Sequence, residues 1–428
     1  MTVFQSLKVR NYRLFASGQV VSLSGTWMQR VAQDWLVLNL SHNSGTAVGI
    51  TTGLQFAPVL IFGMYGGVVA DRYNKRRVLV MTQIVMGLFA LALGLLDLSG
   101  AVELWHVYAL AAALGIASAI DAPVRQAFVT ELVGPSLLAN AVGLNSATFN
   151  AARVLGPAVA GLLIAASGTS WVFLINAASF VAVIVCLLAM RDADLFVGKR
   201  AERRKGAVRE GLAYVRRRPD LMAIIGLVGV VGMLGFNFQL TSALLTKNTF
   251  HHGAGSYGLI SAVYASGSLL GALVSANRGR LGRRRLVFIA AAAYGLIEIL
   301  AGLMPTYWSF FALLVPFGFA TMTFSNAANT TVQLGATASM RGRVMALYIM
   351  VFLGGTPIGA PFIGWIAEIA GPRWSLITGG VASATAAVVA ALYLARRERL
   401  RFEPHLLRRH PHVHVRPTHP APEEALVN

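Results

Sequence analysis

The sequence predicts an all-α integral membrane protein with twelve transmembrane helices. Of its 428 residues, 56% are hydrophobic and only 12% are charged, whereas a soluble domain carries about 25% charged residues. The apolar residues gather in runs of about 20 to 25, the length that a helix needs to cross about 30 Å of hydrocarbon. Helices are expected because backbone groups that face lipid must satisfy their own hydrogen bonds, and the strands of a barrel would each show only about ten alternating residues.

Twelve such runs follow one another along the chain. They cover approximately residues 14–38, 46–70, 78–98, 104–126, 139–166, 168–190, 221–246, 255–277, 285–304, 307–330, 344–369 and 373–395. The connections at 167–170 and 304–308 are short, so the sequence does not define sharp boundaries between the neighbouring spans there. We therefore expect a multi-pass protein of the cell membrane, surrounded by the lipid bilayer.

The excess of positive charge is distributed as in a membrane protein. A net charge of +19 would suggest a nucleic-acid partner for a soluble protein. Here Lys and Arg instead concentrate in every second connection, at 1–13, 71–77, 191–219 and 277–285 and after 395. By the positive-inside rule, both termini lie in the cytoplasm and the number of spans is even. No nucleic-acid partner is expected.

A long charged stretch divides the chain into two halves of six spans each. Residues 1–190 are expected to form an N-terminal six-helix bundle and residues 220–395 a C-terminal one. The basic cytoplasmic linker 191–219 contains "AVREGLAYVRR", which is amphipathic enough to lie as a helix on the inner membrane surface. A solvated linker is an equal alternative. The tail 396–428 is rich in Arg, His and Pro, which predicts a disordered cytoplasmic segment.

The two halves repeat each other. Spans 2 and 8 both contain the pattern Gly-x-x-x-Gly, at Gly63/Gly67 and at Gly267/Gly271, and this spacing lets helix backbones approach closely in lipid. Internal repeats of this kind are typical of transporters, whose binding site lies near the bilayer midplane between the repeats.

The connection between spans 2 and 3 carries a motif. The stretch "GVVADRYNKR" (67–76) resembles the signature of the major facilitator superfamily at this position, G-x-x-x-D-R/K-x-G-R-R/K, with Asn74 replacing the usual glycine. Asn adopts the left-handed conformation more readily than most residues, so the turn is expected to survive. The resemblance covers the whole chain in topology and implies two pseudo-symmetric six-helix bundles.

This motif implies a gating latch formed by Gly67, Asp71, Arg72, Arg76 and Asp121. Gly67 allows span 2 to pack closely. Asp71, at the cytoplasmic surface, can cap the positive N-terminus of span 11 in the other half. Arg72 and Arg76 can pair with the carboxylate of Asp121 at the end of span 4.

A second motif lies in span 5. The stretch "NAARVLGPAVAG" (150–161) resembles a motif of proton-coupled exporters in this superfamily. Gly156 and Pro157 predict a kink, because proline removes a backbone hydrogen bond, and Gly161 leaves room for a neighbouring helix. A generic proline kink is the alternative.

Longer stretches narrow the resemblance. Residues 25–40, 121–133 and 149–163 resemble the branch of enterobactin exporters and macrolide efflux proteins. One departure matters, since residues 104–124 contain no Arg. The proton relay that familiar drug–proton exporters place in span 4 is therefore not carried over.

Few ionisable residues lie inside the spans, where each costs about 2.5–3.5 kcal/mol at a helix centre. Arg30 and Asp34 are four residues apart and therefore share one face of span 1. Asp34 is our first candidate for a carboxylate that exchanges protons during transport. A static Arg30–Asp34 pair that only holds helices together is an equal alternative. The other candidates for proton coupling or for the substrate cavity are polar residues of spans 1, 5 and 10: Gln33, Asn150, Arg153, Asn326 and Asn329.

Two further groups of residues complete the candidates. Six aromatic residues are candidates for an apolar pocket wall: Trp27, Phe56, Phe149, Phe236, Phe238 and Tyr264. Glu368, at the outer end of span 11, is expected to be a gate or a surface charge.

These features favour a secondary active transporter, most simply a proton-coupled monomeric exporter of a drug-like, macrolide or siderophore compound. An importer or facilitator of a small polar metabolite is the alternative, which the sparse buried charge disfavours. A membrane receptor or enzyme is a further alternative. We find no metal-ligand cluster, no nucleophile elbow and no phosphate loop in the sequence, so no catalytic residue, metal or cofactor is expected.

Overall fold

The computed structural model describes residues 4–196, 207–277, 284–337, 340–397, 400–405 and 412–417, and nearly all of them are helical. The first half contains η1 (Gln5–Lys8), α1 (Arg10–Leu40), α2 (Gly45–Arg72), α3 (Lys75–Leu98), α4 (Leu104–Ser167), α5 (Thr169–Leu188) and η2 (Asp192–Asp194). The second half contains α7 (Pro219–Val230), η3 (Val231–Gly235), α8 (Phe238–Leu244), η4 (Leu245–Thr249), α9 (Ala254–Asn277), α10 (Arg284–Leu303), α11 (Tyr307–Gly335), α12 (Arg341–Gly354), α13 (Thr356–Ile369) and α14 (Pro372–Arg397).

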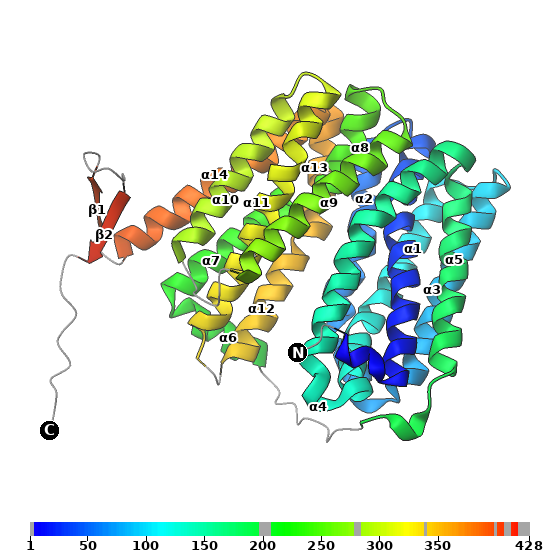
Figure 1. The fold of residues 1–428 in the computed structure, drawn as a ribbon. Helices are drawn as coiled ribbons and strands as arrows, with labels where there is room; N and C mark the ends of the chain where they lie inside the picture. The colour runs from blue at the N-terminus through cyan, green and yellow to red at the C-terminus, as the bar shows by residue number, and fades with distance from the viewer. Residues whose placement is uncertain are drawn as a thin grey trace, which may run out of the picture.

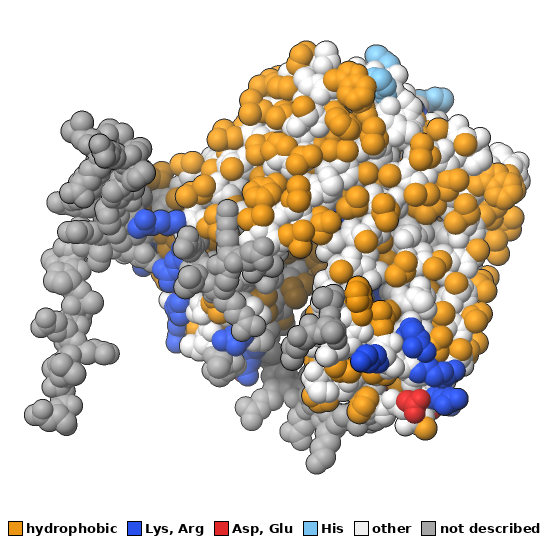
Figure 2. All heavy atoms as spheres, in the orientation of Figure 1, with side chains coloured by type: hydrophobic (Ala, Val, Ile, Leu, Met, Phe, Trp, Pro, Cys, Tyr) orange, Lys and Arg blue, Asp and Glu red, His pale blue; other side chains and the backbone are white. Residues whose placement is uncertain are grey.

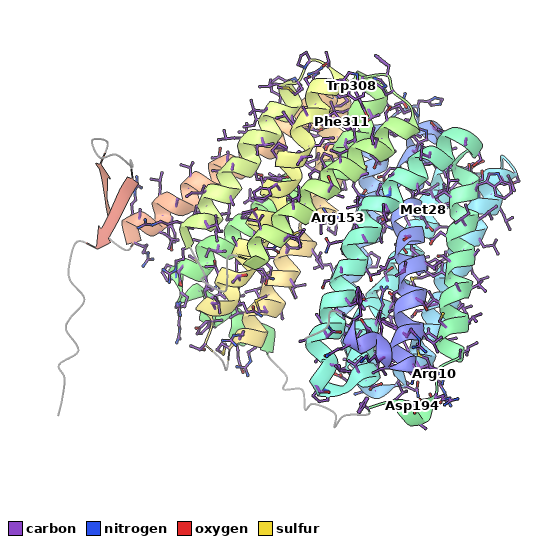
Figure 3. All side chains as sticks on the ribbon, viewed as in Figure 1. Arg10, Met28, Arg153, Asp194, Trp308 and Phe311 are labelled. Carbon is purple, nitrogen blue, oxygen red and sulfur yellow. The ribbon has the colours of Figure 1, made fainter. Side chains whose placement is uncertain are left out.

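The helices form two bundles that meet at one end and stand apart at the other (Figure 1). The N-terminal bundle comprises α1–α5 and the C-terminal bundle α7–α14. Lys and Arg side chains gather where the bundles stand apart, whereas hydrophobic side chains cover the flanks (Figure 2). We call this end, which carries Arg10 and Asp194 (Figure 3), the basic end. The opposite end, where the bundles meet, is called the closed end.

Among the described residues, ten helices are long and apolar enough to cross a membrane. One of them, α4, is 64 residues long and contains a non-helical residue, Gly134, with φ 66° and ψ 178°. The chain turns back there, so α4 covers two of the expected spans. α1 is 31 residues long and is not among the ten, because a stripe of polar residues that includes Arg30 and Asp34 lowers its hydropathy.

Glycines of spans 2 and 8 bring helices into close contact in both halves. In the C-terminal bundle, a side chain on Gly271 would come within 2.7 Å of the carbonyl oxygen of Phe319, so α9 and α11 approach closely. In the N-terminal bundle, Gly63 faces open space, and Gly66 makes the close contact, with the backbone of Ala119. In both repeats the glycine-containing helix, span 2 or span 8, therefore packs on the equivalent neighbour, span 4 or span 10.

The linker contains helix α6 (Ala207–Arg216), which packs on the C-terminal bundle. Glu210 forms an ion pair with Arg343 of α12 at 2.9 Å, and the backbone of Gly211 lies against Arg343. The Tyr214 hydroxyl accepts a hydrogen bond from the Thr337 amide at 3.3 Å. Protein contacts thus hold this amphipathic helix at the basic end.

Parts of the tail, for which the composition predicts disorder, lie among the described residues. Helix α14 continues to Arg397, and β1 (Leu400–His405) pairs with β2 (His412–Pro417) in an antiparallel hairpin.

Candidate substrate cavity

A cavity of about 310 Å³ lies between the two bundles. Both bundles contribute to its wall, as expected for a midplane site between repeats. From the N-terminal bundle the wall includes Trp27, Arg30, Gln33, Asp34, Gln55, Phe56, Arg153 and Pro157. From the C-terminal bundle it includes Phe236, Asn237, Phe238, Gln239, Tyr264, Thr321, Ser325 and Phe352.

Asp34 connects the two bundles. Its carboxylate is only 9% exposed and accepts a hydrogen bond of 2.8 Å from the hydroxyl of Tyr257 on α9. Among the described residues, no ion pair joins Asp34 to Arg30, although they share one face of α1. In this conformation the polar contact of Asp34 is thus with Tyr257 across the bundle interface.

Arg30 and Arg153 both lie near the indole ring of Trp27. The guanidinium carbons are 4.7 Å and 5.9 Å from the ring centroid, within the range of cation–π attraction. Arg30 also lies 5.5 Å from the ring of Phe56, and its Nε is buried and has no hydrogen-bond partner in the described part of the chain. Figure 3 places Arg153 between the bundles. With Asp34 as the one acid in the wall, the lining carries a net positive charge.

Aromatic rings form much of the remaining wall. Phe238 and Tyr264 stack with their centroids 3.8 Å apart, and the Tyr264 hydroxyl donates a hydrogen bond to Thr321 at 2.9 Å. Five of the six expected aromatic residues line the cavity. The sixth, Phe149, packs edge-on against Trp27 at 5.7 Å instead.

Three of the expected cavity residues lie elsewhere. Asn150, Asn326 and Asn329 are half-buried and are not part of the cavity wall. Asn150 uses its amide to donate a hydrogen bond to the Ser146 carbonyl of its own helix at 2.8 Å. Asn150 and Asn329 lie about one turn closer to the basic end than Arg153 and Ser325, which do line the cavity, whereas Asn326 directly follows Ser325 in α11.

The Gly-Pro motif brings α4 against two neighbours. A side chain on Gly156 would come within 2.7 Å of the Trp27 side chain of α1. One on Gly161 would come within 2.9 Å of the Ala254 carbonyl and of the Gly258 Cα in the other bundle. The backbone dihedrals stay helical at Pro157, and only Gly134 departs from helical geometry within α4. The motif therefore provides close packing at the closed end.

The residues of the expected latch do not contact the other bundle. Asp71 and Arg72 are exposed, and no hydrogen bond or ion pair holds them among the described residues. Arg76 pairs with Asp192 at 2.6 Å and donates to the carbonyls of Leu187 and Leu188, so it does not reach Asp121.

Asp121 has other partners because its own helix supplies a cation one turn away. It is fully buried and pairs with Arg125 at 2.8 Å. Thr82 and Gln83 of α3 each donate a hydrogen bond of 2.8 Å to it. Asp121 thus ties α3 to α4 inside the N-terminal bundle.

A carboxylate caps a helix at the closed end instead. Glu368, near the end of α13, accepts hydrogen bonds from the Ser44 hydroxyl at 2.8 Å and from the Thr46 amide at 3.1 Å. These groups form the N-terminus of α2, where a negative charge is stabilised. Lys247 and Asn248 of η4 add hydrogen bonds to Asn39 and to the Asn43 carbonyl.

Sequence reasoning missed Tyr257 and the polar groups around it. Tyr257 is fully buried and also donates towards the Gln239 carbonyl at 3.3 Å. One sequence signal could have identified Tyr257: it is a tyrosine in an otherwise small and apolar stretch of span 8. A buried tyrosine hydroxyl needs a hydrogen-bond partner.

Two helical bundles around a shared, charged midplane cavity define a secondary transporter of the major facilitator type. The family model described as transmembrane secretion effector matches residues 1–416. The chain belongs to this family of the major facilitator superfamily, and it is a membrane transporter rather than an enzyme.

Several characterised proteins resemble the chain over most of its length. The staphyloferrin A transporter of Staphylococcus aureus is 25% identical over 368 residues, which cover 84% of this chain and 90% of that one. The enterobactin exporter EntS of Escherichia coli is 24% identical over 402 residues, covering 92% and 94%. The expected resemblance to enterobactin exporters is thus confirmed.

Solved structures share the fold. A bacterial homologue of the human lysosomal transporter Spinster, in an inward-facing and unoccupied conformation, superimposes with a TM-score of 0.69 at 18% identity. The match covers 90% of this chain and 97% of that one.

Proposed function

We propose that the protein is a proton-driven exporter of a siderophore-like compound. The observation that carries the proposal is the cavity wall, in which Arg30 and Arg153 flank Trp27 beside further aromatic rings. Guanidinium groups favour carboxylate or phenolate oxygens, and aromatic rings favour apolar bulk. A bulky chelator with anionic oxygens combines both. The named relatives, a staphyloferrin transporter and an enterobactin exporter, support the same class.

Asp34 is the group that we assign to proton coupling. An ionised carboxylate accepts a stronger hydrogen bond than a protonated one, so protonation of Asp34 weakens the Tyr257 contact that joins the two bundles at the closed end. When the bundles separate at this end, Asp34 loses the contact and meets the solution, where it can exchange a proton. Protonation and closure are thereby coupled, because each changes the equilibrium of the other.

We further propose twelve spans with both termini in the cytoplasm. The ten candidate helices become twelve when α1 is added and α4 is divided at Gly134. The gathering of Lys and Arg at the basic end supports a cytoplasmic position for it. The conformation described above is then open towards the cytoplasm.

This orientation predicts a labelling pattern. In a Cys186→Ala background, Ser99→Cys at the closed end is expected to react with an impermeant thiol reagent in intact cells, whereas Asp194→Cys at the basic end reacts only after permeabilisation. Both positions are exposed, so accessibility to water is matched. The reverse pattern would overturn the proposed orientation.

The function is tested by transport into inverted membrane vesicles under an imposed pH gradient. We expect a catecholate-type or carboxylate-type siderophore to accumulate when the lumen is acidic, and a collapsed gradient to abolish this. The Arg30→Ala/Arg153→Ala double variant should lose most of the uptake, because the cavity then lacks its positive charge. Accumulation of a neutral macrolide without either siderophore, or uptake that ignores the gradient, would refute the proposal.

A further inference from the structure

A groove opens on the flank of the C-terminal bundle, between α7 and α14. Its volume is about 930 Å³, and it shares no residue with the substrate cavity. Apart from the hydroxyls of Thr378, Thr385 and Tyr393, the side chains of its wall are apolar. We call it the flank groove.

Small residues leave this space open. On α7 they are Ala223 and Gly226, and on α14 they recur one turn apart, at Ala382, Ala386 and Ala390. Gly226 is exposed, and a methyl group added to it would meet no atom within 4 Å. The two helices therefore touch inside the bundle but stand apart on its flank, where lipid surrounds the protein.

The groove extends across the hydrocarbon layer. Trp374 and Tyr393, at its two ends, both belong to α14. Nineteen residues of helix separate them, about 28 Å along the axis, and the hydrocarbon core of a bilayer is about 30 Å thick. Trp and Tyr prefer the two interfaces of a membrane. Tyr393 therefore marks the level of the headgroups at the basic end.

Two arginines border the groove at that level. Arg396 and Arg397 lie one turn beyond Tyr393 and line a hollow of about 560 Å³, which shares Val389 and Tyr393 with the flank groove. Both arginines are exposed, and among the described residues no hydrogen bond or ion pair holds them. The Arg397 guanidinium lies 6.0 Å from the centroid of the Tyr393 ring. Two cations thus stand free at the end of an apolar groove.

Neighbouring charges keep this end positive. Asp220, the acid at the start of α7, already pairs with Arg218 at 2.8 Å and with Arg284 at 3.1 Å. Arg216 and Arg217, which precede α7, are exposed as well. In the sequence, the stretch "RRERLRFE" (396–403) contains more arginines than glutamates. An anion is therefore attracted to the arginine end of the groove.

We propose that the flank groove binds an anionic phospholipid. The acyl chains would lie along the small residues of α7 and α14, and the phosphate would contact Arg396 and Arg397. Guanidinium groups form strong, charge-assisted hydrogen bonds with phosphate, and basic pockets between membrane helices bind anionic headgroups. A free phosphate ion would leave the apolar part of the groove unused. The inference goes beyond the proposed exporter function and does not depend on the transported compound.

The position of the groove links a bound lipid to transport. Val230 belongs to the wall of the groove and directly precedes η3, after which Phe236, Asn237 and Phe238 line the substrate cavity. A lipid that fills the space between α7 and α14 would hold the two helices at a fixed distance. It would thereby steady one side of the cavity.

Thermal unfolding of the purified full-length protein in detergent tests the proposal. Phosphatidylglycerol and phosphatidylcholine with identical acyl chains are compared, so that only the charge of the headgroup differs. We expect phosphatidylglycerol to raise the unfolding midpoint more, because a ligand that binds the folded state stabilises it. The Arg396→Gln/Arg397→Gln variant should bind phosphatidylglycerol about tenfold more weakly or worse, since each Lys or Arg near an anionic membrane surface contributes about fivefold. Arg10→Gln/Arg13→Gln, an exposed pair at the basic end of the other bundle, is the matched control and should keep the preference.

A second variant tests the apolar part of the groove. Gly226→Leu fills the open space with a residue that favours helix, so the protein should fold and yet bind less phosphatidylglycerol. Native mass spectrometry measures the bound lipid directly, including in variants of low stability. Glycerol phosphate, a headgroup without chains, should leave the unfolding midpoint unchanged.

Four results would overturn the proposal. The first is an equal effect of the two lipids on the wild-type protein, and the second is an unchanged preference in Arg396→Gln/Arg397→Gln. The third is stabilisation by glycerol phosphate as strong as that by the lipid, which would show a phosphate site without a lipid. The fourth is undiminished lipid binding in Gly226→Leu, or a dimer that this variant dissociates, which would show that lipid does not occupy the groove.

Discussion

Asp34→Asn is expected to abolish the accumulation of substrate that a pH gradient drives, while substrate exchange down its own gradient continues. The amide has nearly the same shape and can still accept the hydrogen bond from Tyr257, but it cannot bind and release a proton. For one proton exchanged, a gradient of one pH unit supports about tenfold accumulation, since each unit corresponds to about 1.36 kcal/mol. That whole factor should disappear.

Two variants separate proton coupling from folding. Tyr257→Phe removes the hydrogen bond but keeps the carboxylate, so gradient-driven transport should persist with an altered pH dependence. Asp97→Asn changes a carboxylate at the closed end whose partners, Thr169 and Ser170, lie within the same bundle; it should leave coupling intact. If Asp34→Asn still accumulates substrate against its gradient, Asp34 is merely structural and another carboxylate, such as Asp121, must carry the proton.

Neutralising Asp71 and neutralising Glu368 are expected to have opposite effects on the conformation. Glu368 caps the N-terminus of α2 at the closed end, and the latch hypothesis has Asp71, at the other end of α2, cap the N-terminus of α12. α12 and α13 together form one candidate span, Arg341–Ile369, so each carboxylate would hold α2 against this span in one of the two states. The charge–dipole attraction is worth about 0.3–2 kcal/mol, which can shift the ratio of the two states by up to about thirtyfold.

The populations of the two conformations can be measured by the rate at which a thiol reagent labels one cavity residue from each side of the membrane. Ser325 lines the cavity, so Ser325→Cys in the Cys186→Ala background is labelled in vesicles of each orientation. Glu368→Gln should speed labelling from the closed end, and Asp71→Asn should speed labelling from the basic end and lower transport. Glu103→Gln is the control, because this carboxylate bonds only within its own helix, to Trp105. Shifts in the same direction, or none, would contradict the paired latches.

The sequence predicted well whatever depends on local composition. Apolar runs long enough for lipid and the alternation of Lys and Arg are properties of short windows, so the helical elements and the basic end were accessible. The polar stripe of α1 was also visible, because Arg30 and Asp34 are one turn apart. Its residues Arg30, Gln33 and Asp34 line the cavity between the bundles.

Contacts between distant helices could not be read in this way. The hydrogen-bond partner of Asp34 is Tyr257, 223 positions away in the sequence. Arg76 forms its ion pair with Asp192, and Asp121 is paired with Arg125 of its own helix. The asparagines of α11 have the right chemistry for a cavity, yet Asn326 directly follows the lining residue Ser325 without being part of the wall, and Asn329 lies one turn closer to the basic end. Which residues of a helix line the cavity depends on where the two bundles meet, and the sequence of one span alone does not determine this.

The closed end has an energetic consequence for the transport cycle. Its hydrophobic cluster mixes side chains of both bundles, among them Val31 and Trp35 with Leu244 and Ile363. Separating the bundles there moves apolar surface into water at about 25 cal/mol per Å², so each 100 Å² costs about 2.5 kcal/mol. This is close to the work that one charge performs in crossing a membrane potential of 100 mV, about 2.3 kcal/mol. The area of that seal therefore contributes to the free-energy difference between the two conformations, and so to how often and how fast the closed end opens. Glycines such as Gly161 and Gly258 bring the two backbones into direct contact there.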